Sequence, residues 1–440
     1  MLVDGCHLRG ESVPMVPRRG FIRRRQVELG RDATQFHAWF WFELATRLLE
    51  RIDGKQEPGC FDMSDIPHFV CVFGTRPEAI KMAPVVKALQ GIPEVRTSVV
   101  TTGQHREMLD QVLDFFGIEP DLRLDVMRHQ QTLVDLTAGL IQALEPAIAR
   151  LKPSLVIVHG DTTTTFAAAL SAFYARIPLA HVEAGLRTRD LQAPWPEEAN
   201  RRLTAVLAAY HFAPTERARQ ALLAEGHLSD RIVVTGNTVI DALLDALAKL
   251  DSNPKLRRES LAFLPEIPPD ARCILVTGHR RENFDGGLQS LCDALNRLTE
   301  RPDVEVVFPI HLNPVVQGVV RKRLSPNRRI HLLPPLDYPV FVTAMRLAKI
   351  ILTDSGGIQE EAPSLGKPVL VLRETTERPE AVEAGTVKLV GTDVSRIVRE
   401  VSVLLDEPDE YARMALAHNP YGDGQAASII VQALRRHFGI

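Results

Sequence analysis

Cysteine is scarce in this chain, and the cysteines present follow no metal-binding or disulfide pattern. The 440 residues include five cysteines, an odd number, and none of them forms a Cys-x-x-Cys pair. This usage argues against a disulfide framework or a cysteine-based zinc site, and it predicts a reducing compartment. Cys71 and Cys273 lie inside apolar runs, so we expect both in the core.

The chain also lacks an excess of charge and a long apolar run. Its 52 Lys and Arg residues nearly balance 55 Asp and Glu residues, which gives a net charge of −3. Such a balance provides no broad field for DNA, RNA or anionic lipid, so no nucleic-acid or membrane partner is expected. No stretch approaches the roughly 20 apolar residues of a membrane span. An anionic ligand must then be held by a local cluster of cations.

Residues 1–65 differ from the remainder of the chain. They are rich in arginine, carry an aromatic group at 36–42, and show no alternation of strand and helix patterns. The pair Arg18-Arg19 resembles a twin-arginine export signal, but the apolar segment that should follow is missing. A cytoplasmic location is therefore expected. The segment is predicted to be a disordered extension or, in preference, the product of a misassigned start. A peptide from residues 51–62 in the native protein would contradict the misassignment.

Residues 66–440 alternate between short apolar runs and helical patterns. Continuous apolar strands that alternate with helices indicate parallel sheets covered on both faces. The units are too many for one doubly wound sheet, so we predict an α/β fold of two Rossmann-like domains with an interdomain cleft. The first domain is placed at 66–237 and is completed by a C-terminal helix at 424–440. The second, nucleotide-binding domain is placed at 238–423.

Ligands of such folds bind at the carboxyl ends of the strands, so the residues just after strands are the candidates. The first strand is followed by Gly74 to Lys81, where Pro77 suits the first turn of a helix. Arg76 and Lys81 then lie near a helix N-terminus, which is a natural anion site. An alternative left open is that Glu78 and Lys81 form only a charge pair along the helix.

Three acidic residues follow later strands or lie in a rigid turn. Asp161 comes after the apolar run 155–159 and is placed to cap a helix. The four threonines 162–165 are poor helix formers, which indicates a crowded polar site. Glu183 follows another buried strand, and Glu197 lies in a proline-rich turn. The three carboxylates are predicted to converge on one site, with caps and surface ion pairs as the alternative.

The second half offers a histidine, a glycine turn and a further cation after its strands. His279 is the candidate for a group that titrates near neutral pH, and the arginines next to it favour anion binding. The turn 355–357 opens a helix whose N–H groups can hold a phosphate, and Glu361 follows one turn later to receive sugar hydroxyls. Arg378 follows the next strand. Together with the cations of the first half, these residues predict a nucleotide diphosphate derivative gripped from both domains.

The motifs that carry these residues resemble those of a known family. Over roughly residues 66–440 the chain resembles the non-hydrolysing UDP-N-acetylglucosamine 2-epimerases, which make UDP-N-acetylmannosamine for bacterial surface polysaccharides. The resemblance implies a GT-B fold, a UDP-binding second domain, a homodimer, and no nicotinamide, metal or other cofactor. It rests on Gly74–Lys81, His159–Thr165, His181–Arg187, Pro194–Arg201, Gly278–Asn283 and Asp354–Gly366.

The resemblance also implies roles for single positions. Those that match residues of the chemistry are Asp161, Glu183, Glu197 and His279. Those that match substrate-binding residues are Arg76, Lys81, Asp161, Glu183, His279, Phe341, Ser355, Gly356, Gly357, Glu361 and Arg378. A second, activating substrate site is matched by Gln104, His105, Arg281 and His311. The chain departs from that pattern at 130–131, where some members place an arginine.

The implied reaction explains why these groups are needed. The C2 proton of the sugar is weakly acidic because no carbonyl adjoins it, whereas loss of UDP from C1 allows C2 to lose its proton as a C1=C2 double bond forms. The leaving diphosphate needs electrostatic stabilisation. Removal and return of a proton on opposite faces needs at least two acid–base groups. Which carboxylate serves which face stays open. A GT-B glycosyltransferase, a hydrolysing epimerase and a silent nucleotide-sugar sensor are the alternatives.

Overall fold

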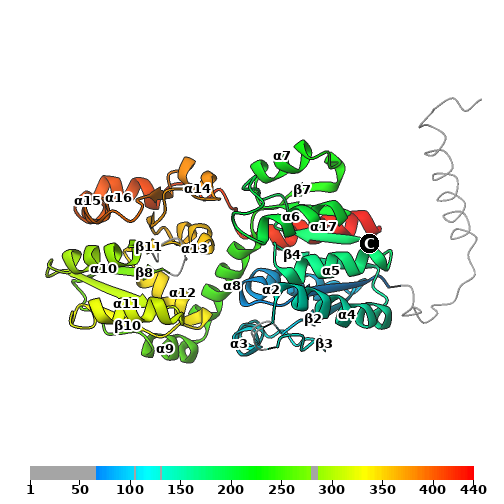
Figure 1. The fold of residues 1–440 in the computed structure, drawn as a ribbon, viewed down its shortest axis with the longest axis horizontal. Coiled ribbons are helices and arrows are strands. Elements are labelled where there is room, and N and C mark those ends of the chain that lie inside the picture. The colour runs from blue at the N-terminus through cyan, green and yellow to red at the C-terminus, as the bar shows by residue number, and fades with distance from the viewer. Residues whose placement is uncertain (1–65, 104–105, 129–130, 279–285) are drawn as a thin grey trace, which may run out of the picture. The chain divides into compact units, whose positions relative to one another are not determined.

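The computed structural model describes residues 66–103, 106–128, 131–278 and 286–440, which form two β-sheets with helices around them (Figure 1). Within these residues the first sheet has seven strands in the order β3-β2-β1-β4-β5-β6-β7, and all neighbours pair in parallel. Its strands are β1 (His68–Phe73), β2 (Arg96–Thr101), β3 (Leu122–Arg123), β4 (Leu155–His159), β5 (Leu179–Val182), β6 (Tyr210–Ala213) and β7 (Ile232–Val234).

The second sheet is also parallel throughout its described strands. Its order is β10-β9-β8-β11-β12-β13. The strands are β8 (Arg272–Thr277), β9 (Val304–Pro309), β10 (Ile330–Leu333), β11 (Ile350–Thr353), β12 (Val369–Val371) and β13 (Val387–Leu389).

Helices alternate with the strands along the whole described chain. Those before β8 are α2 (Arg76–Gln90), α3 (Arg106–Phe116), α4 (Leu133–Leu151), α5 (Thr163–Tyr174), α6 (Glu197–Leu207), α7 (Glu216–Ala224), η1 (Ser229–Arg231), α8 (Thr238–Ser252) and α9 (Pro254–Ala262). Those after it are α10 (Gly287–Leu298), α11 (Pro314–Leu324), α12 (Tyr338–Leu347), α13 (Gly356–Glu361), η3 (Ala362–Leu365), α14 (Pro379–Glu383), α15 (Val394–Asp406), α16 (Pro408–Ala415) and α17 (Ala426–Phe438).

The central strands are buried on both faces, as their unbroken apolar sequences require. Every residue of β1 and of β4 is buried, and so is every residue of β11. A strand covered by helices on both sides has no solvent face to mark with polar residues. The predicted pair of Rossmann-like parallel sheets is confirmed. Cys71 and Cys273 are buried in the core, also as predicted.

The last helix returns to the first sheet. Helix α17 contacts α2 and α8 (Figure 1). The ring of Phe438 packs edge-on against Phe69 of β1, with centroids 4.8 Å apart. Where the chain passes between the two sheets, the Asn237 N–H donates to the Tyr421 carbonyl over 2.7 Å. Gly236 has φ +82°, and a Cβ there would lie 3.1 Å from that carbonyl, so glycine suits this crossing. Among the described residues, no helix is both long enough and apolar enough to cross a membrane.

Strand order decides which loops meet. Strands β1, β4 and β5 are consecutive neighbours in the first sheet, and β8, β11 and β12 are consecutive in the second. Parallel neighbours end at the same edge, so the segments that follow each set lie side by side. These are the segments that carry the candidate residues named above.

Candidate active site

Lys81 links the two sheets through a pair of buried carboxylates. Its ammonium contacts Glu183, which follows β5, and lies 3.1 Å from Oε2 of Glu360 in α13. Burial by itself lowers the pKa of Lys81, but the two carboxylates outweigh it and raise the pKa. Lys81 therefore stays charged. The alternative of a simple Glu78–Lys81 helical charge pair is wrong, because the partners of Lys81 come from other elements.

Glu183 is held as an anion in an unusual backbone conformation. Burial by itself raises its pKa, but Lys81, His159 and Arg378 together hold the pKa of Glu183 well below its usual range. The Asn237 side-chain amide donates to its Oε2 over 2.7 Å. Glu183 has φ +61°, a left-handed conformation that costs free energy in a residue with a Cβ. Strain of this kind, held in place by surrounding contacts, is typical of functional positions.

Glu78 is a buried carboxylate that joins two of the loops, and its role was not predicted. Its Oε2 accepts the backbone N–H groups of Gly74 and Thr75 over 3.0 and 2.8 Å. Its Oε1 lies 2.6 and 3.0 Å from the hydroxyls of Thr162 and Thr165. The crowded threonines are thus explained, since they bind the loop that precedes Arg76. The Thr75-x-x-Glu78 capping box was the available signal.

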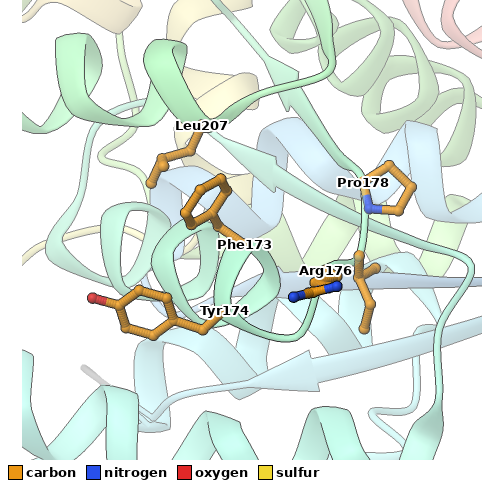
Figure 2. Close-up of a pocket in the computed structure, with 6 residues that line it drawn as sticks. Phe173, Tyr174, Arg176, Pro178 and Leu207 are labelled. Carbon is orange, nitrogen blue, oxygen red and sulfur yellow. The ribbon is translucent and has the colours of Figure 1, made fainter.

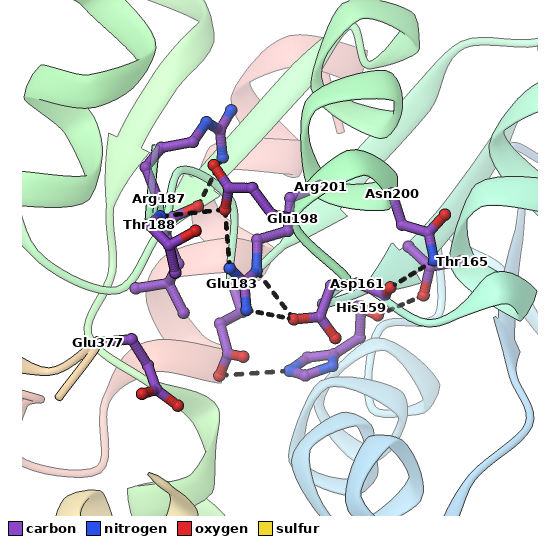
Figure 3. Close-up of polar contacts among 12 residues, drawn as sticks. His159, Asp161, Thr165, Glu183, Arg187, Thr188, Glu198, Asn200, Arg201 and Glu377 are labelled. Carbon is purple, nitrogen blue, oxygen red and sulfur yellow. Dashed lines mark hydrogen bonds and ion pairs between the residues drawn. The ribbon is translucent and has the colours of Figure 1, made fainter. Parts of the chain in front are cut away.

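Asp161 is an ion-pair partner and not a helix cap. The N-cap of α5 is Thr162, whose hydroxyl accepts the N–H of Thr165 over 3.1 Å, so the predicted cap at Asp161 is wrong by one residue. Oδ2 of Asp161 accepts from Nε of Arg201 over 2.8 Å, and its carbonyl accepts from the Asn200 side chain over 2.9 Å. Figure 3 shows Asp161 and Glu183 in one group of polar side chains with His159.

The two adjacent glutamates at the start of α6 have different environments. Glu198 is fully buried, and its carboxylate accepts from Arg201 over 2.9 Å and from the backbone N–H groups of Thr188 and Arg189 over 3.1 and 3.2 Å (Figure 3). Glu197 is partly buried, and its buried Oε2 has no hydrogen-bond partner among the described residues. Glu198 therefore organises the turn, while Oε2 of Glu197 is buried without a hydrogen-bond partner among the described residues.

The second sheet contributes Arg378 and the glycine turn. Nε of Arg378 donates to Oε1 of Glu360 over 2.6 Å, and Nη1 lies 3.0 Å from Oε1 of Glu377. A Cβ on Gly356 would lie 2.5 Å from Nη1 of Arg378, so only glycine allows this approach. Ser355 occupies the N-cap position of α13 without a side-chain capping bond, and its N–H donates to the hydroxyl of Thr353 over 2.9 Å. The predicted cation and the predicted glycine turn are thus in contact.

Glu361 is buried among polar groups. The hydroxyl of Tyr338 donates to Oε2 of Glu361 over 3.3 Å. Burial is the largest influence and, only partly opposed by Lys81, raises the pKa of Glu361 to about 8. Arg76 is close enough to act on the same carboxyl, and its guanidinium donates to the Leu336 carbonyl over 2.8 Å. The side chains of Arg76 and Glu361 thus come from different sheets and share one region.

This raised pKa predicts a pH-dependent stability. Between its usual pKa of 4.5 and the folded value of about 8, Glu361 binds more protons in the native than in the unfolded state. The free energy of unfolding should therefore fall as pH rises through this window, by at most about 1.4 kcal/mol per pH unit from this group. Glu361→Gln should remove that slope. Urea unfolding of both proteins across the window checks this, and parallel pH profiles would contradict it.

The remaining predicted positions are less connected or lie outside the described residues. Phe341 is partly buried in α12, and its ring packs against the core. His311 is exposed after β9, and its Nδ1 accepts the N–H of Asn313 over 3.2 Å. Gln104, His105, His279 and Arg281 lie outside the described residues. No group of three or more His, Cys, Asp or Glu residues in the described part of the chain is placed to hold a metal ion.

A separate pocket of about 610 Å³ lies at the ends of α5 and α6 (Figure 2). It is lined by Phe173, Tyr174, Arg176, Ile177, Pro178 and Leu207. None of the predicted site residues lines it, so this pocket is distinct from the candidate active site.

Comparison with known proteins identifies the family of this chain. A family model described as UDP-N-acetylglucosamine 2-epimerase matches residues 87–435. The UDP-N-acetylglucosamine 2-epimerase of Escherichia coli K12 is 57% identical over 367 residues, which are 83% of this chain and 98% of that protein. The chain belongs to the UDP-N-acetylglucosamine 2-epimerase family.

Solved structures of the epimerase family have the same fold. The Neisseria meningitidis UDP-GlcNAc 2-epimerase bound to UDP-GlcNAc superposes with a TM-score of 0.80 at 51% identity, over 84% of this chain and all of that one. The S. aureus MnaA–UDP co-structure superposes with a TM-score of 0.77 at 46% identity, over 85% of this chain and 97% of that one. The predicted GT-B class is confirmed, and so is the resemblance to the epimerases.

Proposed function

We propose that this chain interconverts UDP-N-acetylglucosamine and UDP-N-acetylmannosamine by reversible epimerisation at C2 of the sugar. The observation that carries the proposal is the group in which Lys81 and Arg378, from different sheets, share Glu360 while Glu183 contacts Lys81. Two cations beside an ionised carboxylate suit a departing diphosphate next to a proton acceptor. The N. meningitidis relative with bound UDP-GlcNAc and the S. aureus relative with bound UDP support this ligand class.

The proposed reaction is an elimination followed by an addition. The C1–O bond breaks and its electron pair leaves with UDP, while a carboxylate takes the proton from C2. The C–H electron pair becomes the C1=C2 bond of 2-acetamidoglucal. On return, an acid delivers a proton to the other face of C2 and UDP oxygen adds again to C1. The elimination and the addition consume no oxidant, reductant or cofactor.

Side-chain geometry suggests how the work is divided. Lys81 and Arg378, with the N–H groups of Gly356 and Gly357, would stabilise the diphosphate. Glu183 suits the proton acceptor because it is ionised and its Oε2 is anchored, while its Oε1 has no hydrogen-bond partner among the described residues. The acid for the opposite face would be Asp161 or Glu197.

Further elements of the proposal come from the family resemblance. His279 would assist at the diphosphate, Glu361 and Arg76 would contact the nucleotide, and Phe341 would lie at the uracil. We also propose a non-hydrolysing isomerase, a homodimer, a cytoplasmic location, and the domain boundaries 66–237 and 238–423 with the helix at 424–440. We also propose activation by substrate at a second site formed by His311 with Gln104, His105 and Arg281.

Incubation of the purified chain with UDP-N-acetylglucosamine alone tests the activity. Proton NMR should show UDP-N-acetylmannosamine appearing without added acceptor or cofactor, and the same mixture should form from either sugar nucleotide. Free N-acetylmannosamine with UDP would indicate a hydrolysing enzyme instead. A requirement for an acceptor would indicate a glycosyltransferase, and an unchanged substrate that binds would indicate a sensor.

The elimination step has its own signature in D2O. Deuterium should appear at C2 of both sugar nucleotides, because the proton that leaves exchanges with solvent before another returns. An 18O label in the bridging C1–O position should also move to non-bridging positions of the β-phosphate. Turnover without deuterium at C2, or with an unmoved label, would contradict the elimination.

A further inference from the structure

His159 is a buried histidine next to Glu183. It has no role in the reaction proposed above. It is the last residue of β4, it is 4% exposed, and neither ring nitrogen has a hydrogen-bond partner among the described residues. Its Nε2 lies 3.6 Å from Oε2 of Glu183, just beyond hydrogen-bonding distance (Figure 3). Buried polar groups are normally paired, so an unpaired imidazole aimed at a carboxylate calls for an explanation.

Three nitrogen atoms converge on a single oxygen of Glu183. Lys81, Asn237 and His159 all face Oε2. The first two contact it, whereas the histidine does not. This arrangement leaves Oε1 without a hydrogen-bond partner among the described residues, and it fixes the carboxylate plane only as long as Oε2 keeps its partners.

Lys81 has a second role in the proposed reaction, and that role competes with its contact to Glu183. Under the proposed function, the same ammonium stabilises the diphosphate of the substrate. A diphosphate carries more negative charge than one carboxylate, so its binding should draw Lys81 away from Glu183. Oε2 would then lose its charged partner at the moment when Oε1 must accept a proton.

We propose that His159 is a positioning residue that replaces Lys81 at Oε2 of Glu183 when a diphosphate is bound, so that Oε1 stays aimed at C2. The inference rests on the proposed function. Because a carboxylate only accepts hydrogen bonds, the histidine donates its Nε2–H. A movement of less than an ångström brings the two atoms within hydrogen-bonding distance.

Other charged and titratable groups also act on Glu183 and bear on the pH dependence. They are Lys81 in α2, His181 in β5, Arg378 before α14 and Tyr421 after α16. Burial holds the pKa of His181 at about 3, so it stays neutral, and burial raises the pKa of Tyr421 above the working range. Arg378 keeps its charge throughout. None of these four groups changes its charge near neutral pH.

Four variants of the full chain test this role by kinetics. His159→Phe keeps the ring and removes both nitrogens, and it should lower kcat ~10- to 100-fold with little change in KM. The acid limb of the kcat profile should move to higher pH, since a carboxylate that has lost a donor is protonated more easily. The acid limb of the kcat/KM profile should shift less toward higher pH, because Lys81 still pairs with Glu183 in the free enzyme.

Two conservative variants and a matched control separate positioning from packing. The amide nitrogen of His159→Gln can reach the place of Nε2 and should restore most of kcat, while that of His159→Asn corresponds to Nδ1 and should not. His211→Phe makes the same change at a buried histidine of β6 whose Nδ1 is also unpaired, and kcat should stay at the wild-type value. Equal losses in both phenylalanine variants, or a wild-type kcat for His159→Phe, would overturn the proposal.

A binding experiment tests the exchange without turnover. In the chain labelled with 15N-histidine, saturation with UDP should shift the His159 Nε2–H resonance downfield and slow its exchange with water. The resonance is identified by its loss in His159→Phe. An unchanged resonance at saturation would overturn the proposal even if the chain is an epimerase. A shifted resonance without epimerisation would sustain this inference and refute the proposed function.

Discussion

Glu183→Gln is expected to lower kcat by ~10²- to 10⁴-fold, the range set by loss of a positioned acid–base group. Glutamine has nearly the same shape but cannot take up the C2 proton. The buried ammonium of Lys81 keeps Glu360, at 3.1 Å, as its counter-ion, so the fold should survive. Turnover is measured by NMR with UDP-N-acetylglucosamine, and deuterium exchange at C2 is measured in the same samples. Exchange should fall together with turnover.

The matched control for this change is Glu216→Gln. Glu216 also forms an ion pair, with Nη1 of Arg219 at 2.9 Å, but its side chain is exposed. Surface ion pairs contribute little to stability, so this variant should keep the wild-type kcat and nearly the wild-type Tm. A Glu183→Gln enzyme with wild-type turnover would remove Glu183 from the chemistry. A Glu183→Gln enzyme that fails to fold, beside a folded control, would assign Glu183 to structure instead.

Glu198→Ala is expected to lower the free energy of unfolding by about 3–5 kcal/mol, as is typical when one partner of a buried ion pair is removed. The carboxylate of Glu198 is fully buried and holds Arg201 at 2.9 Å together with two backbone N–H groups. Its loss leaves a buried guanidinium with only Asp161 as a charged partner among the described residues. Denaturant unfolding, monitored by circular dichroism, measures the change.

The substitution Glu197→Ala, at the neighbouring residue, should leave stability nearly unchanged and lower activity. The buried Oε2 of Glu197 has no hydrogen-bond partner among the described residues, so its removal should change stability by less than about 0.5 kcal/mol or raise it slightly. Under the proposed function, kcat should fall by ~10²-fold or more. Two adjacent glutamates would thus divide between structure and chemistry. Similar stability losses in both variants would contradict this division.

Several elements were predictable because their signals are local. The apolar runs 155–159 and 350–353 coincide with β4 and β11, since a strand buried on both faces must be apolar throughout. The residues after strand ends were found for the same reason, because in parallel sheets these positions meet at one edge. The capping boundary was missed by one residue. Asp161 and Thr162 both cap helices well, and only the ion pair with Arg201 decides between them.

Partners across the fold could not be predicted. Lys81 and Glu183 are 102 positions apart, and no periodicity links a helix residue to a particular loop in another unit. The roles of Glu78 and Glu360 were missed because each looks like an ordinary helical glutamate. Their burial among donors follows from how the loops pack. The sequence pattern also placed two carboxylates in the turn at 197–198 without indicating which one faces inward.

By itself, the amino-acid sequence determined the class of fold, the edge at which ligands bind and the chemical types of the groups there. Those properties depend on the order of apolar, polar and turn-forming residues over short stretches of the chain. Only the tertiary structure decided that Lys81 and Arg378 share one carboxylate, that Glu183 is an anchored anion and that Glu361 is a protonated acid near neutral pH. Charge states of buried groups depend on desolvation and on partners distant in sequence, and these exist only once the chain has packed.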